Sequence, residues 1–212
     1  DVGCGAGALL AHLRALGWEG TGVEPDERAR RSAAARVPGA ALHASVEDAA
    51  ASAPGGFDAV TLSHVVEHLE DPFGTLVACR RALRVEGWLV VRTPNPASAA
   101  CTRFGASWLH WDPPRHLQLY GARGLRALLA DAGFVVRRAF TTAASAHFAW
   151  LASALLERDG RLPGLRTSHA PLSLRLRAIA SGWREHAGVA RGEPVGEELV
   201  AIASPTQPGR TP

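Results

Sequence analysis

Three glycines at alternating positions, Gly3, Gly5 and Gly7, constrain the fold of this chain more than any other feature of its sequence. They follow Asp1 and Val2, which read as the end of a strand, and precede leucines spaced as on one face of a helix. Glycine lets a backbone turn sharply and approach a ligand closely, and the N-terminus of a following helix offers N–H groups. We therefore expect a strand–loop–helix unit with a ligand seated against the glycines.

The carboxylate of Glu24 is a second feature of a nucleotide-type site. It lies 21 residues after Gly3, at the end of a short predicted strand over 21–23. A carboxylate in that place accepts hydrogen bonds from two ribose hydroxyls. The loop satisfies the dinucleotide fingerprint, with Ala8 in its last place, and also the different spacing Asp-x-Gly-x-Gly-x-Gly. These features predict a cofactor that contains a nucleoside, without saying which one.

Predicted strands and helices alternate along the chain. The expected strands cover 1–2, 21–23, 41–43, 57–62, 88–91, 134–136 and 198–203. The expected helices cover 9–16, 26–37, 72–85 and 125–132, the third with Asp71 as its N-cap. This alternation indicates an α/β fold with a doubly wound, mostly parallel sheet, in which the loops after the strands share one edge. Any ligand site belongs at that edge.

The later part of the chain departs from this alternation. Residues 99–120 are rich in aromatic residues, histidine and proline, and we expect them to form a loop-rich lid. The predicted core comprises 1–140 plus 193–204, with a helical insertion at 141–192 before the last strand and a loose tail at 205–212.

Six segments in the same order resemble the Rossmann-like, class I methyltransferases that use S-adenosylmethionine. The segments are DVGCGAG at 1–7, GVEPD at 22–26, FDAVTLSHVVEHLEDP at 57–72, LRVEGWLVVRTPNP at 83–96, WDPPRHLQLYGARGLRALLADAGF at 111–134 and GEELVAIA at 196–203. The fifth is similar to a subgroup with a Pro-Pro-Arg-His-Leu lid. The resemblance covers about 150 residues and leaves the insertion out. It implies a seven-stranded sheet and S-adenosyl-L-methionine as the cofactor.

The resemblance also implies a set of cofactor-binding residues. They are Asp1, Gly3, Cys4, Gly5, Gly7, Glu24, Pro25, Ser45, Val46, Ser63 and His64. The loop residues would surround the amino-acid end of the cofactor, and Glu24 would hold its ribose. Pro25 and the segment 45–46 would lie beside the adenine, where the family usually has an acid in place of Ser45. The segment 63–64 would lie under the sulfonium, whereas we expect the Cys4 side chain to pack beneath the turn.

Two histidines after the fourth predicted strand admit another interpretation. His64, Glu67 and His68 match the pattern His-x-x-Glu-His of inverted zinc peptidases. That chemistry needs both histidines on a long helix, whereas here a strand precedes them and a new helix begins near Asp71. We therefore expect no metal site. The remaining interpretations are that the pair orients the loop or that one histidine faces substrate.

The lid segment carries the candidates for acceptor binding and proton transfer. Trp111 and Arg115 are predicted to contact substrate, unless Trp111 and Trp108 only pack and Arg115 only makes a structural ion pair. A general base is needed only where the acceptor must lose a proton. His116 is the first candidate for that base and His68 the second, because imidazole titrates near neutral pH.

The composition of the chain argues against a nucleic-acid partner and against a membrane span. All 23 basic residues are arginines spread along the chain with a net charge of +3, which does not predict a nucleic-acid surface. No apolar run approaches the roughly 20 residues of a membrane span. The spacing of the three cysteines suggests neither a disulfide nor a metal, so we expect a reducing, cytoplasmic compartment. The chain lacks Met, and we expect it to be N-terminally truncated.

These observations predict an enzyme that moves a methyl group from S-adenosylmethionine to an oxygen or carbon of a small-molecule acceptor. The apolar faces of 141–192 would form a homodimer contact or cover a lipid-like acceptor. Two alternatives share the glycine loop and Glu24. One is a NAD-dependent oxidoreductase, which would not explain the segments 63–72 and 111–117. The other is a cofactor-binding protein without catalysis.

Overall fold

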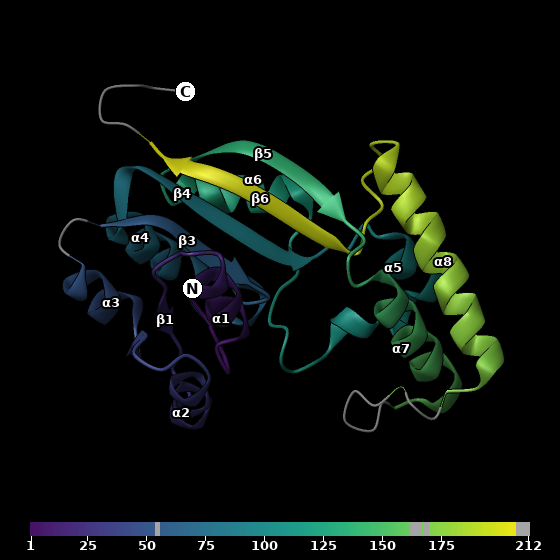
Figure 1. Cartoon of the computed structure of the whole chain (residues 1–212). Helices are drawn as coiled ribbons and strands as arrows, with labels where there is room; N and C mark the ends of the chain where they lie inside the picture. Colours follow the sequence, from purple (N-terminus) through teal and green to yellow (C-terminus); the bar gives the residue numbers. More distant parts are fainter. Residues whose placement is uncertain (54–55, 162–166, 168–169, 207–212) are drawn as a thin grey trace. The chain divides into compact units, whose positions relative to one another are not determined.

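The computed structural model describes residues 1–53, 56–161, 167 and 170–206. These residues form two compact units, and each is described by itself (Figure 1). Unit 1 comprises Asp1–Arg92, Arg126–Arg138 and Ala201–Pro212, and unit 2 comprises Thr93–Leu125 and Ala139–Val200. The boundaries between the units fall inside three strands and one helix, so neither unit corresponds to a single stretch of sequence.

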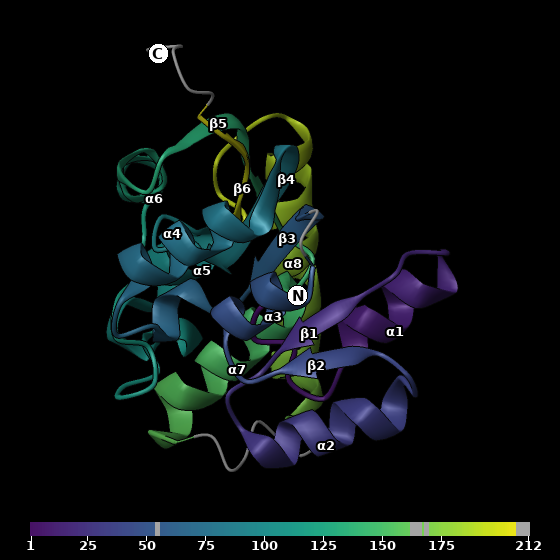
Figure 2. The same cartoon turned by 90° about the vertical axis from the view of Figure 1, so that its left-hand side faces the viewer.

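Parallel pairing builds the sheet that carries the glycine loop. β1 (Thr21–Val23) pairs with β2 (Ala41–His43), and β3 (Phe57–Ser63) pairs with β4 (Leu83–Pro94). Val2 makes parallel bridges to both Val23 and Leu62, and therefore connects β1 to β3. Figure 2 shows β1 and β2 side by side, with α2 (Glu27–Arg36) along them.

Two further strands extend the sheet beyond β4, in the order β3-β4-β6-β5. They are β5 (Phe134–Thr142) and β6 (Glu198–Pro205), whose arrows point in opposite directions in Figure 1. The described residues thus form six strands, with Val2 bridging between β1 and β3. The prediction of an α/β, Rossmann-like fold is confirmed.

Side-chain caps begin several of the helices. Asp26 caps α2, and Asp71 caps α4 (Pro72–Ala82) by accepting from the Gly74 N–H at 2.8 Å. Ser45 caps α3 (Val46–Ser52), and Ser98 caps α5 (Ala99–Phe104). A cap accepts from an N–H that has no partner within its own helix, so these polar residues set where each helix begins. The expected cap at Asp71 is confirmed.

The remaining helices are divided between the two units. α1 (Ala8–Ala15) follows the glycine loop, and α6 (Ala122–Asp131) precedes β5. In unit 2, α7 (Ala146–Asp159) packs against α8 (Leu172–Ala190), and Figure 1 shows the pair side by side. Three short 3₁₀ turns complete the described elements: η1 (Val66–His68), η2 (Gly105–Ser107) and η3 (Leu109–Trp111). Among the described residues, no helix combines the length and the apolar character that crossing a membrane requires.

Several predicted boundaries were wrong. The helix expected over 72–85 ends at Ala82, because Leu83 is buried and pairs with Phe57 at the start of β4. α3 was missed because its Ala-rich sequence buries only Val46 and Ala49, which is too few for a clear helical period.

The last two strands extend past the ends expected for them. β5 continues to Thr142, two residues into the segment expected to be helical. Pro205 still belongs to β6, and the Thr206 N–H donates to the Gly133 carbonyl at 2.9 Å. The rest of the expected loose tail, 207–212, lies outside the described residues.

Candidate functional site

Steric crowding explains why glycine occupies two positions of the loop in unit 1. All three loop glycines have positive φ, between 52° and 74°. A Cβ on Gly3 would lie 2.4 Å from Val65 Cγ2, and one on Gly7 would lie 3.1 Å from the Ala33 Cβ. A Cβ on Gly5 would instead meet nothing within 4 Å. The middle of the loop therefore faces open space, as a loop that receives a ligand must.

Glu24 holds this loop to the turn after β1. One of its carboxylate oxygens accepts from the Gly5 N–H at 2.9 Å, and the other accepts from the Asp26 N–H at 3.0 Å. The side chain that the sequence assigns to ribose binding therefore lies at the glycine loop. Each carboxylate oxygen has a second lone pair, so hydrogen bonds from ribose hydroxyls remain possible.

Asp1 and Cys4 flank the loop in different ways. The Asp1 carboxylate accepts from the Thr61 hydroxyl at 2.7 Å, which fixes its side chain beside β3. Cys4 is buried in a small apolar cluster with Leu10 and Ala33. Burial, followed by the nearby charge of Glu24, raises the pKa of the Cys4 thiol. The thiol therefore stays protonated at neutral pH, as expected of a side chain packed beneath the turn.

The three residues expected near the adenine have unequal surroundings. Pro25 is exposed, and its carbonyl accepts from the Arg30 guanidinium at 2.8 Å. The Ser45 hydroxyl accepts from the Asp48 N–H at 3.1 Å as the cap of α3, while Val46 is buried. The capping bond occupies one lone pair of Ser45 and leaves its O–H to donate.

The end of β3 places Ser63, its last residue, and His64 next to the glycine loop, since Val65 lies against Gly3. The Ser63 hydroxyl accepts from Arg92 Nε at 3.1 Å. His64 has φ of 54°, and its Nδ1 lies 3.3 Å from Oε1 of the fully buried Glu67. A non-glycine residue in that conformation is uncommon and is found preferentially at functional sites.

The same loop excludes the geometry of the inverted zinc peptidases. His68 lies at the end of η1, a single 3₁₀ turn, whereas His64 has a left-handed backbone. The two histidines are therefore not one turn apart on a long helix, which that motif requires.

The lid candidates belong to unit 2. The Trp111 indole donates to the Gly105 carbonyl at 2.8 Å and remains 45% exposed. Arg115 forms an ion pair with Asp112 at 2.5 Å. Trp111 and Arg115 both line a cavity of about 650 Å³ next to α7. These two residues are thus brought together, although each also has a structural partner.

His116 has a defined tautomer. Its Nδ1 lies 2.6 Å from the His110 carbonyl oxygen. A carbonyl only accepts, so Nδ1 carries the proton and, in the neutral ring, Nε2 carries the lone pair. That is the form a general base needs. His116 belongs to unit 2, whereas His68, the second candidate, belongs to unit 1.

Glu197 is a buried acid to which the sequence prediction assigned no role. It is fully buried, and its Oε1 accepts from the Trp108 indole at 2.6 Å. Burial raises its pKa to about 8, against the opposing effects of hydrogen bonds from Trp108 and Ser98. Its only sequence signal was the pair of acids, Glu197 and Glu198, that leads into an apolar strand.

The fold is shared with known methyltransferases. A SAM-dependent methyltransferase from Archaeoglobus fulgidus superposes with a TM-score of 0.60 at 20% identity, over 96% of this chain and 84% of that chain. The family model described as a methyltransferase domain matches residues 1–139. The chain therefore belongs to the methyltransferase-domain family, as the resemblance predicted.

The chain is also similar in sequence to curated O-methyltransferases. The chain is 35% identical over 100 residues to the ubiquinone biosynthesis O-methyltransferase of Thiobacillus denitrificans, covering 45% of this chain and 43% of that protein. The protein with the same name in Xanthomonas campestris is 36% identical over 123 residues, covering 51% of this chain and 48% of that protein. The chain thus spans less than half of the length of these relatives.

Glu197 should make the stability of the protein depend on pH. Its pKa lies near 8 in the folded state and at the ordinary value of 4.5 in the unfolded chain. Between these two pH values the folded protein therefore binds more protons than the unfolded chain. The free energy of unfolding should therefore fall as pH rises from about 5 to 8, by at most about 5 kcal/mol at about 1.4 kcal/mol per unit. Urea titrations at several pH values measure this slope.

Glu197→Gln should flatten that slope, leaving the smaller contribution of Glu185, whose pKa is also raised by burial. Glu193→Gln is the matched control, because Glu193 is exposed and pairs with Arg191 at the surface. Equal slopes in the wild type and in Glu197→Gln would show that Glu197 is not the group that titrates.

Proposed function

We propose that this protein transfers a methyl group from S-adenosylmethionine to an oxygen or carbon of a small-molecule acceptor. The observation that carries the proposal is the contact between Glu24 and the Gly5 N–H at 2.9 Å, which brings a ribose-binding acid to a loop that faces open space. The names of the curated relatives favour oxygen as the methylated atom.

The residues present fit the cofactor. When bound, S-adenosylmethionine supplies an electrophilic methyl group on a positively charged sulfur. The residues that would hold it are Asp1, Gly3, Cys4, Gly5, Gly7, Glu24, Pro25, Ser45, Val46, Ser63 and His64. Glu24 would orient the ribose, and the segment 63–64 would lie near the methyl group, since its neighbour Val65 lies against Gly3. Most of the catalytic effect would come from holding the acceptor in line with the methyl group.

The lid would supply acceptor binding and the base. Trp111 offers an exposed aromatic face and Arg115 a cation at one cavity, which suits a small polar or aromatic acceptor. With a hydroxyl acceptor, His116 Nε2 would take the hydroxyl proton while the oxygen gains the methyl group that the cofactor would supply. His68 is the second candidate for this role.

Finer features of the fold are proposed with the function. We place a seventh strand of the sheet at Val2, which bridges to both neighbouring strands. We assign the Pro-Pro-Arg-His-Leu segment to the lid, 1–140 plus 193–204 to the core and 141–192 to the insertion. The free thiols of all three cysteines support a reducing, cytoplasmic compartment.

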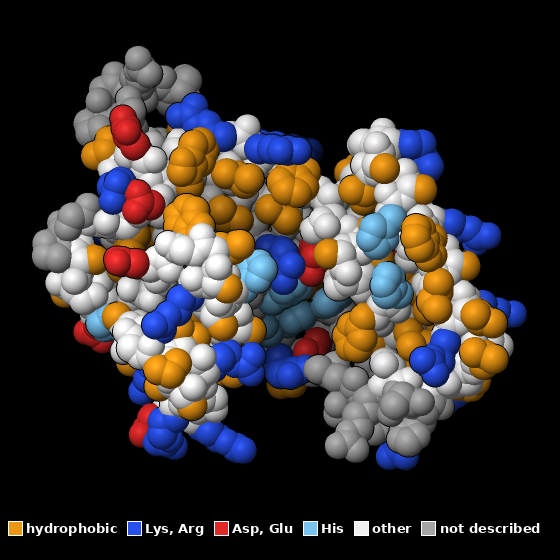
Figure 3. Space-filling model, viewed as in Figure 1, with side chains coloured by type: hydrophobic (Ala, Val, Ile, Leu, Met, Phe, Trp, Pro, Cys, Tyr) orange, Lys and Arg blue, Asp and Glu red, His pale blue; other side chains and the backbone are white. Residues whose placement is uncertain are grey.

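A homodimer through the insertion is supported by the surface of α8. Leu172, Leu176, Ile179 and Trp183 recur at helical spacing and are between 46% and 71% exposed. Figure 3 shows hydrophobic side chains, interleaved with arginines, over this helix on the right of the view. Burying such a stripe against a second copy would remove apolar surface from water.

Glu24→Ala should weaken cofactor binding by about 1–3 kcal/mol, because a carboxylate that accepts from ribose would be lost. Calorimetric titration of S-adenosylhomocysteine measures the change, with NAD as a parallel titrant. Glu27→Ala is the control, since Glu27 is exposed and pairs with Arg31 on the surface of α2. An unchanged affinity in Glu24→Ala would remove Glu24 from the site, and binding of NAD instead would overturn the methyltransferase proposal.

His116→Ala should lower kcat by about a hundredfold or more while leaving S-adenosylhomocysteine affinity unchanged, as expected on losing a general base. Transfer of label from tritiated S-adenosylmethionine to candidate hydroxyl acceptors measures turnover. His12→Ala, at an exposed position of α1, is the control. Full turnover by His116→Ala would end its candidacy and leave His68→Ala as the next variant.

Trp183→Glu should convert a dimer to a monomer, because it places a charge in the middle of the apolar stripe. Light scattering after gel filtration reports the mass. Val85→Glu is a matched control at another exposed apolar residue, 65% exposed and outside the insertion. A wild-type protein that is monomeric, or a variant that stays dimeric, contradicts an interface at α8.

A further inference from the structure

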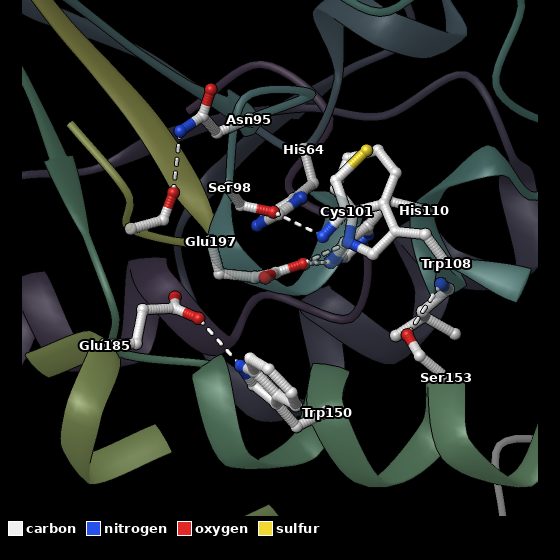
Figure 4. Close-up of polar contacts among 12 residues, drawn as sticks. His64, Asn95, Ser98, Cys101, Trp108, His110, Trp150, Ser153, Glu185 and Glu197 are labelled. Carbon is white, nitrogen blue, oxygen red and sulfur yellow. Dashed lines mark hydrogen bonds and ion pairs between the residues drawn. The ribbon is translucent and has the colours of Figure 1, made fainter. Parts of the chain in front are cut away.

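A buried carboxylate anchors the segment of unit 2 that carries His116. Glu197 Oε1 accepts from Trp108 Nε1 at 2.6 Å and lies 3.4 Å from His110 Nε2 (Figure 4). Trp108 is 1% exposed and Glu197 is fully buried. The carboxyl therefore holds the residue before η3 and the middle residue of η3 at the same time.

This anchor continues to His116 through the backbone. The His110 carbonyl accepts from His116 Nδ1 at 2.6 Å, and the two imidazole rings are stacked at 6.2 Å with 10° between their planes. The bond that places the His116 proton on Nδ1 thus depends on where η3 holds one carbonyl. Glu197, which directly precedes β6, is the buried group that contacts Trp108 and His110 and thereby fixes η3.

Among the described residues of unit 2, no arginine is among the groups that shift the pKa of Glu197. Ser98 and Cys101 lie on the side of α5, with Glu185 on α8 and Glu198 on β6. The two other carboxyls raise the pKa of Glu197, and burial raises it most.

A second buried carboxyl provides an internal comparison. Glu185, 2% exposed, accepts from Trp150 Nε1 at 2.8 Å, which is the same kind of bond as that between Glu197 and Trp108 (Figure 4). Glu185 differs in that its indole partner Trp150 lies on α7, whereas Trp108 directly precedes η3. Glu185 also accepts a hydrogen bond from the backbone of Glu197, so it lies one contact further from His116 than Glu197 does.

We propose that Glu197 is a positioning residue for methyl transfer: through Trp108 and His110 it fixes the carbonyl that keeps the His116 proton on Nδ1 and the lone pair on Nε2. The effect on turnover rests on the proposed function of His116 as the base. The effect on the His116 tautomer rests on the geometry alone.

The test compares Glu197→Leu with Glu185→Leu in protein labelled with ¹⁵N-histidine. Each variant removes a buried carboxyl that accepts from an indole, so both should lose stability. Glu197→Leu should reduce the fraction of His116 with its proton on Nδ1 and lower kcat by roughly ten- to a hundredfold. Glu185→Leu should change both much less, because Glu185 reaches His116 only by way of Glu197. The KM for S-adenosylmethionine should stay within about twofold of the wild type in both, since cofactor contacts are unchanged.

Glu197→Gln should rescue much of the loss, because its amide oxygen still accepts from Trp108. Should Glu197→Leu not fold, Trp108→Phe takes its place, since it removes the indole bond and keeps the carboxyl. An unchanged His116 tautomer in these variants, or an equal change in Glu185→Leu, overturns the proposal. A changed tautomer with unchanged kcat would uphold the positioning chain and count against His116 as the base, which separates the two failures.

Discussion

The backbone pairing of Val2 is the constraint on which the rest of unit 1 depends. It bridges to Val23 and to Leu62, and so joins two pairs of parallel strands into a continuous arrangement. Gly3 and Cys4 follow at once, and both of their N–H groups donate to the Val23 carbonyl. The glycine loop is thereby held at the carboxyl ends of β1 and β3, where Glu24 and the loop after β3 also begin.

Unit 2 is organised by a different interaction, the burial of carboxyls beside indoles. Burying an acid is unfavourable unless it is hydrogen-bonded or neutralised by a proton. Glu197 combines both, with an indole bond and a pKa raised to about 8 by burial. Glu185 repeats the arrangement with Trp150, which ties α8 to α7. These polar bonds define the packing of the insertion and lid more narrowly than apolar contacts alone would.

Local sequence signals correctly predicted features that depend on hydrogen bonds between residues close in the chain. Asp71 caps α4 as expected, because a cap bonds an N–H only three residues away. The predicted ends of α4 and β5 were wrong because pairing between strands that are distant in sequence sets them, as between Leu83 and Phe57. Glu197 escaped prediction because its partner Trp108 lies 89 residues earlier in the sequence.

The class of protein follows from sequence alone, because glycines that need positive φ, an acid directly after β1 and the order of the motifs together specify a methyltransferase-domain chain. The left-handed backbone of His64, the tautomer of His116 and the burial of Glu197 could be read only from the folded protein. The physical reason is that backbone turns and caps depend on adjacent residues, whereas protonation and burial depend on groups that folding brings together from distant parts of the chain.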